Sequence, residues 1–279
     1  MPPGGRCNRH LLADPPDRYA EERGAEFWRD GVKQIALAVG TSLFLVLWEL
    51  AFQLGVVALH WQPTELALYA GDKAGFAVLL ALVLTIGRRW RACGFAGPLA
   101  LARWWMLWPI WFDALVPLTQ GPAEDSALYL VGWGAVSLAV GIGEEGLFRG
   151  VIMGGLGLDR PRRAIVVSSV LFGAIHLAGL LSPIDYRLVL AQAASVVGLG
   201  LILGAVRIRA ASIWPCVIVH AVLDFCGIAA GGGVVEAMQY SDDAVFSMLG
   251  AGGVALAWGL VLCWRLPTPP TAMPQPAAA

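Results

Sequence analysis

Charged residues are scarce in this chain, and their scarcity excludes the ordinary soluble classes. Only 14% of the 279 residues are Asp, Glu, Lys or Arg, whereas 58% are hydrophobic, and the mean hydropathy is +0.68. This composition is too apolar for a soluble domain and is typical of a protein with several membrane-spanning segments. The net charge of −1 provides no general attraction for nucleic acid. The expected partner of the chain is therefore the lipid bilayer.

Three further features are missing from the sequence. The five cysteines have no metal-type spacing, so we expect reduced thiols rather than disulfides. No His-Glu-x-x-His motif is present, so any metal site would need ligands from separate helices. No convincing internal repeat or pair of broken helices occurs, which argues mildly against a transporter.

The chain contains many long apolar runs. Eight of them suggest spanning helices, at residues 35–59, 66–86, 99–118, 128–154, 164–181, 188–206, 213–230 and 244–264. The sequence therefore predicts an all-α, polytopic membrane protein with a bundle of eight transmembrane helices over residues 31–266. Residues 1–30 are expected to form a polar cytoplasmic tail with a surface helix. Residues 267–279, rich in Pro and Ala, are expected to be disordered.

The run 99–118 is the weakest of the eight, because its tryptophans would also suit a helix in the membrane interface. The distribution of Lys and Arg residues indicates that this run crosses the membrane. With the N-terminus inside and eight crossings, nearly all of the 19 Lys and Arg residues are cytoplasmic; Lys73 and Arg187 fall outside, and Arg149 lies within the membrane. We therefore expect both termini in the cytoplasm. The Ala, Gly, Arg and Trp content suggests a bacterial inner membrane.

One apolar run contains three charged residues, Glu144, Glu145 and Arg149. Each charge at the bilayer centre is unfavourable by roughly 2.5 to 3.5 kcal/mol, so the group is a functional-site hypothesis. On an ideal helix Glu145 and Arg149 share a face and can pair, whereas Glu144 points about 100° away. We therefore expect Glu145 and Arg149 to support the site, and Glu144 to face a cavity as a general base.

Two later runs add His176, and His220 followed four residues later by Asp224. At about 1.5 Å per residue from the basic boundary of each helix, these residues share a layer with Glu144. A carboxylate beside a histidine can deprotonate water, and a second histidine can stabilise the oxyanion that forms. Glu144, His176 and His220 could instead hold a divalent metal such as zinc, with an open position for water.

The same residues form three motifs in chain order, Glu144-Glu145-x-x-x-Arg149, Phe172-x-x-x-His176 and His220-x-x-x-Asp224. This set resembles the CPBP family of intramembrane proteases, which includes the CAAX prenyl endopeptidase Rce1 and bacteriocin-processing relatives. The resemblance covers roughly residues 128–230, the expected catalytic core. It implies peptide-bond hydrolysis in which Glu144 and His176 activate water. It places His220 and position 224 on the oxyanion side and gives Arg149 a supporting role.

Two other motif residues, Glu145 and Phe172, are also expected to be supporting. Position 224 departs from the prenyl-protease relatives, which resemble one another in having Asn there, and is similar to bacterial relatives in having Asp. An ionised Asp cannot donate a hydrogen bond to an oxyanion, so Asp224 is expected to orient His220 or to bind a metal. The family architecture favours glutamate-activated water without a cofactor, and zinc is the alternative.

The leading hypothesis is an intramembrane endopeptidase that acts on a membrane-associated peptide or protein. One alternative is a proton- or cation-coupled transporter that uses the same buried Glu and His residues. Another is a catalytically silent scaffold of the immunity type. The other polar residues within the runs, Glu49, Asp113 and Gln192, are expected to pair with one another or with backbone, or to line the cavity.

Overall fold

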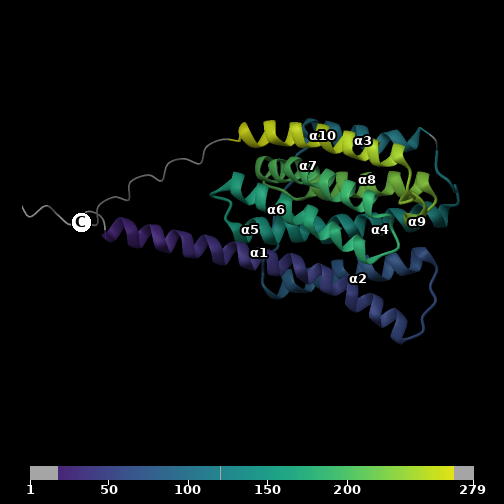
Figure 1. Cartoon of the computed structure of the whole chain (residues 1–279), viewed down its shortest axis with the longest axis horizontal. Coiled ribbons are helices and arrows are strands. Elements are labelled where there is room, and N and C mark those ends of the chain that lie inside the picture. Colours follow the sequence, from purple (N-terminus) through teal and green to yellow (C-terminus); the bar gives the residue numbers. More distant parts are fainter. Residues whose placement is uncertain (1–17, 120, 267–279) are drawn as a thin grey trace, which may run out of the picture.

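The structure, a computed structural model, describes residues 18–119 and 121–266, with side chains from residue 30 onward. Helices are the only regular elements over these residues (Figure 1). They are, in chain order, α1 (Arg18–Ala58), α2 (Glu65–Ile86), η1 (Leu101–Leu107), α3 (Trp108–Leu118), α4 (Ala127–Glu145), η2 (Gly146–Ile152), α5 (Met153–Leu156), α6 (Pro161–His176), η3 (Leu177–Leu181), α7 (Tyr186–Ala210), α8 (Trp214–Gly231), α9 (Val234–Ala237) and α10 (Asp242–Trp264).

Seven helices in the described part of the chain are long and apolar enough to cross a membrane. The predicted count of eight is therefore corrected, because the run 99–118 consists of the 3₁₀ helix η1 followed by the short α3. Pro109 explains the break: it lacks the amide hydrogen that would continue an α-helical ladder from η1, but it fits the first turn of α3.

The segment that contains the two short helices nevertheless runs along the whole of α8. At one end Gly97 lies against Ala211 and Ser212, just before α8 begins. At the other end the Ala123 amide donates a 2.8 Å hydrogen bond to the Ala229 carbonyl, near the end of α8. The segment between α2 and α4 therefore connects the two ends of the bundle.

Helices α2 and α4 lie side by side and run in the same direction, which requires such a connection. Gly132 packs against Leu66, and Gly143 packs against Phe76 about three turns further along both helices. A Cβ at Gly143 would lie 2.8 Å from the Phe76 ring, so only glycine permits this approach. The close contact holds the glutamate-bearing end of α4 against α2.

Large apolar side chains cover the outside of the bundle. Leu47, Leu54, Val131 and Phe246 are between 61% and 72% exposed. A surface with so much exposed hydrocarbon is unsuited to water and suits lipid tails. Together with the seven candidate spans, it identifies the chain as an integral membrane protein.

Helix α1 continues without a break from Arg18, and its candidate membrane span covers Asp30–Ala58. One detail of the predicted organisation changes. Lys73, expected outside the membrane, lies about two turns inside α2. Residues 1–17 of the tail predicted at 1–30, and the whole tail predicted at 267–279, lie outside the described residues.

Candidate active site

The two adjacent glutamates occupy different surroundings at the junction of α4 and η2. Glu145 is fully buried, and its Oε1 accepts a 3.2 Å hydrogen bond from Nη1 of Arg149, which is also buried. The predicted contact between these two residues is therefore present. Residues 146–152 form a π-helix, which widens the helix at Arg149; such irregular turns are frequent at functional sites.

Glu145 also binds His220, a contact that the sequence did not predict. His220 Nδ1 lies 2.8 Å from Glu145 Oε1, and a carboxylate can only accept, so Nδ1 carries the proton. The other ring nitrogen, Nε2, lies 3.9 Å from Glu144 Oε2 and 3.6 Å from Asp224 Oδ2. Glu145 thus fixes the ring so that Nε2 faces the two remaining carboxylates.

His176 is the last residue of α6 and is oriented by its own helix. Its Nδ1 lies 2.7 Å from the Phe172 carbonyl oxygen, so this nitrogen also carries a proton. In the neutral ring, Nε2 therefore has a free lone pair that can accept a proton or a hydrogen bond from water.

The Phe172 ring links the members of the site. It is fully buried, and its centroid lies 4.9 Å from that of His176 and 6.0 Å from that of His220, both edge-on. The Arg149 guanidinium carbon lies 4.4 Å from the same ring centroid, within cation–π range. Phe172 thus lies between the imidazoles of His176 and His220 and packs over the buried Arg149 guanidinium.

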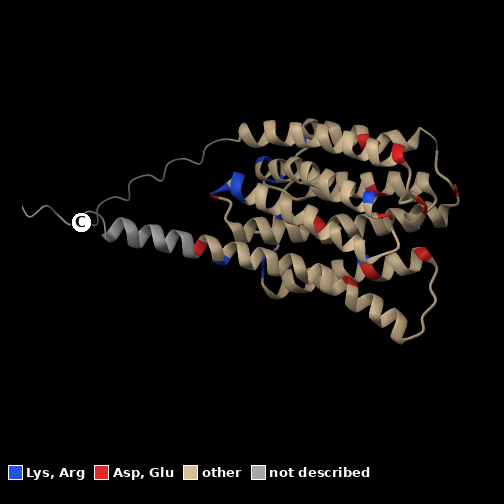
Figure 2. Cartoon of the chain, viewed as in Figure 1, with Lys and Arg blue, Asp and Glu red and all other residues tan. Residues whose placement is uncertain are grey.

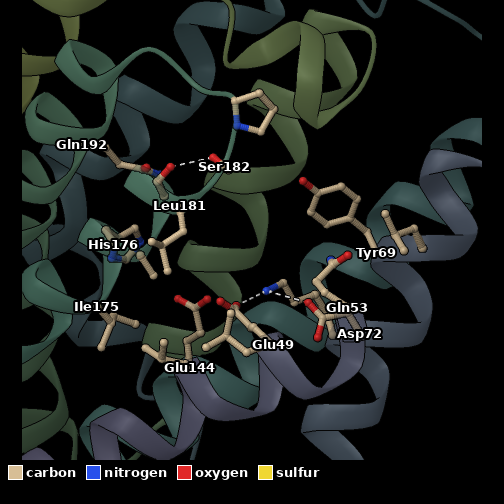
Figure 3. Close-up of a pocket in the computed structure, with 17 residues that line it drawn as sticks. Glu49, Gln53, Tyr69, Asp72, Glu144, Ile175, His176, Leu181, Ser182 and Gln192 are labelled. Carbon is tan, nitrogen blue, oxygen red and sulfur yellow. Dashed lines mark hydrogen bonds and ion pairs between the residues drawn. The ribbon is translucent and has the colours of Figure 1, made fainter. Parts of the chain in front are cut away.

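Glu144 and His176 line one cavity of about 570 Å³. Figure 3 shows both side chains pointing into this space, with Gln53, Tyr69 and Asp72 across from them. The Glu144 side chain is 14% exposed, in contrast to the complete burial of Glu145. The cavity is large enough to receive an extended stretch of peptide beside the carboxylate.

The wall opposite Glu144 carries an ion network that the sequence analysis missed. Lys73 Nζ lies 2.5 Å from Glu49 Oε1 and 3.0 Å from Asp72 Oδ2. Trp48 Nε1 donates to Asp72 Oδ1 at 2.9 Å. The sequence feature that identified Glu144, a charged residue inside an apolar run, is also present at Asp72 and Lys73 and could have identified this network.

A second cavity, of about 210 Å³, lies on the other side of His176. It is lined by His220 and Asp224 and also by Asp113. His176 and Gln192 line both cavities. Glu49, Gln192 and Asp113, whose roles the sequence left open, thus all lie on cavity walls, and Glu49 is paired with Lys73 rather than with Asp113 or Gln192.

The donor set does not fit the metal-binding alternative. No group of three or more His, Cys, Asp or Glu side chains in the described part of the chain is placed to hold a metal ion. Both imidazoles use Nδ1 in hydrogen bonds to the protein, which leaves Nε2 as the only ring nitrogen of each that could bind a metal. A zinc ion bound by Glu144, His176 and His220 would require ligand distances of about 2 Å from a common point.

Comparison with known proteins supports the family expected from the three motifs. Residues 126–226 match the family model of Rce1-like type II CAAX prenyl endopeptidases. The match begins at the start of α4 and ends within α8, so it includes every residue of the three motifs. No curated protein and no solved structure matches the chain.

Proposed function

We propose that this integral membrane protein, whose residues 126–226 match the Rce1-like family, is an intramembrane endopeptidase. It hydrolyses a peptide bond of a membrane-associated peptide or protein, using water activated by Glu144 and His176. The observation that carries this proposal is that both side chains face one peptide-sized cavity, with His220 Nε2 3.9 Å from the Glu144 carboxylate.

Glu144 acts first as a general base. A water between Glu144 and His176 donates one proton to the carboxylate while its oxygen attacks the carbonyl carbon of the substrate. The His176 Nε2 lone pair accepts the second O–H of this water as a hydrogen bond, because His176 Nδ1 already donates to Phe172. The two groups therefore position the nucleophile as well as activate it.

His220 stabilises the oxyanion that forms during the attack. Attack converts the carbonyl oxygen into an anion, which the imidazolium form of His220 can stabilise by donation from Nε2–H. Glu145, bonded to Nδ1, holds this ring and stabilises its positive charge. Asp224 accepts only, so it orients His220 rather than contacting the oxyanion. The tetrahedral intermediate then collapses as the C–N bond breaks, and Glu144 returns its proton to the leaving amine.

The test begins with substrate identification, by comparing peptides that accumulate in cells with and without the protein. The purified full chain is then incubated with the accumulating species, alongside Glu144→Gln and the surface control Glu236→Gln. We expect cleavage by wild type and the control, and cleavage slowed by about 10² to 10⁴ in Glu144→Gln. Cleavage by Glu144→Gln at the wild-type rate, or ion flux in proteoliposomes without any cleavage, would contradict the proposal; the second result would favour the transporter alternative.

A further inference from the structure

The cavity that contains Glu144 extends toward one end of the bundle. Its wall continues from Glu144 through the last two turns of α1 at Gln53, the first turns of α2 at Tyr69, and η3. Beyond η3 it reaches Ser182, which Figure 3 labels, and the next residue, Pro183; both are exposed in the loop before α7. The rim of the cavity therefore lies at the end where α1 finishes and α2 begins.

Toward the other end the chain is tightly packed. Below Glu144, the side chains of Phe148, Ile152 and Leu156 are at most 2% exposed. Phe76 and Leu80 of α2 close the same region from the opposite side and are at most 6% exposed. A peptide approaching from this end would have to separate a close-packed core, which is strongly unfavourable.

The two ends differ in charge (Figure 2). The closed end carries the arginines of the loops and helix termini, namely Arg88, Arg89, Arg91, Arg103, Arg160, Arg162, Arg163, Arg207, Arg209 and Arg265. The open end carries mainly acidic residues, namely Glu65, Glu124, Asp125, Asp185, Glu236, Asp242 and Asp243. Loops rich in Lys and Arg stay in the cytoplasm, so the arginine end is the cytoplasmic one.

We infer that substrate reaches Glu144 and His176 from the acidic end of the bundle, past Gln53, Tyr69 and Ser182, on the face of the membrane away from the cytoplasm. This inference rests on the proposed endopeptidase function. The substrate class is then an exported or membrane-anchored polypeptide whose cleaved segment lies on that face. A polypeptide confined to the cytoplasm meets only the closed, arginine-rich end.

Cysteine labelling tests the sidedness without using activity. The full chain carries Cys7→Ser, since Cys7 lies outside the described residues, and its four other cysteines are buried. Single variants Ser182→Cys at the rim, Asp243→Cys at the same end and Asp159→Cys at the arginine end are treated with a sulfonated, membrane-impermeant maleimide. In intact cells we expect labelling of Ser182→Cys and Asp243→Cys, and labelling of Asp159→Cys only after permeabilisation. The reverse pattern would overturn the inference.

Access is tested next with a bulky maleimide–polyethylene glycol. On Ser182→Cys it should slow cleavage at least about 100-fold, because the peptide can no longer reach an attack position. On Asp243→Cys, remote from the cavity, it should leave cleavage unchanged. Unimpaired cleavage by modified Ser182→Cys would disprove this access route. If no cleavage occurs with any variant, the endopeptidase proposal fails, whereas the labelling pattern still decides which face the cavity opens on.

Discussion

His220 Nδ1 donates a 2.8 Å hydrogen bond to Glu145, the neighbour of the proposed base. The adjacent glutamates therefore differ in function because they differ in partners. Glu145 lies between Arg149 and His220 and is fully buried, whereas the Glu144 carboxylate is the one that lines the cavity. Substitutions at these two glutamates and at the groups around them test this division.

Substitution of the two glutamates should separate catalysis from stability. Glu144→Gln should lower cleavage by about 10² to 10⁴, the usual contribution of a general base, with little change in thermal stability. Glu145→Gln should destabilise the fold by about 3 to 5 kcal/mol, because it leaves the buried Arg149 without its carboxylate. Cleavage assays and thermal unfolding of both purified variants are the measurements; equal stability losses in the two would contradict the assignment.

His176 should be needed for its outward nitrogen rather than for its packing. In His176→Asn the amide NH₂ can replace Nδ1–H as the donor to the Phe172 carbonyl, but nothing replaces Nε2. We expect a normal unfolding temperature and a loss of about 10² or more in kcat. A substantially active His176→Asn protein would show that Nε2 takes no part in the reaction.

Asp224 should be replaceable by a residue that keeps an acceptor oxygen. Its Oδ2 lies 3.6 Å from His220 Nε2, and an Asn oxygen can occupy the same place. Asp224→Asn is therefore expected to retain clearly more activity than Asp224→Ala. Kinetic comparison of the two variants decides the point, and equal inactivation would mean that the negative charge itself is required.

The ion network opposite the base should couple α1 to α2. Lys73→Met leaves Glu49 and Asp72 facing the cavity without their cation, so we expect loss of stability and of substrate binding. The double variant Glu49→Gln/Lys73→Met should recover part of the loss, with a coupling free energy of about 0.5 to 3 kcal/mol. Thermal unfolding of the wild type, both single variants and the double variant completes the cycle; strict additivity would rule out the coupling.

Chelation should leave the proposed cleavage unchanged. In the part of the chain that the structure describes, no group of three or more His, Cys, Asp or Glu side chains is placed to hold a metal ion. We therefore expect unchanged cleavage after dialysis against a chelator, and substoichiometric zinc by elemental analysis. Stoichiometric zinc whose removal abolishes activity and whose return restores it would establish the metal mechanism instead.

The sequence by itself determined the class of protein and the candidate reactive groups. Long apolar runs require helices in a bilayer, because backbone groups must be hydrogen-bonded within each segment there. Charges inside such runs are unfavourable enough to mark Glu144, Glu145 and Arg149 without a structure. Helical spacing also predicted the Glu145–Arg149 contact, since residues four apart share a face.

Only the tertiary structure decided how separate helices meet. The Glu145–His220 bond joins residues 75 positions apart, and the Glu49–Lys73 bridge joins α1 to α2; neither follows from helical periodicity. The course of the Trp-rich segment along α8 likewise depended on contacts at the two ends of α8, at Gly97 and Ala123. Local spacing determines which face of a helix a residue occupies, whereas the packing of glycines such as Gly143 against α2 sets which faces meet, and so where the cavity opens.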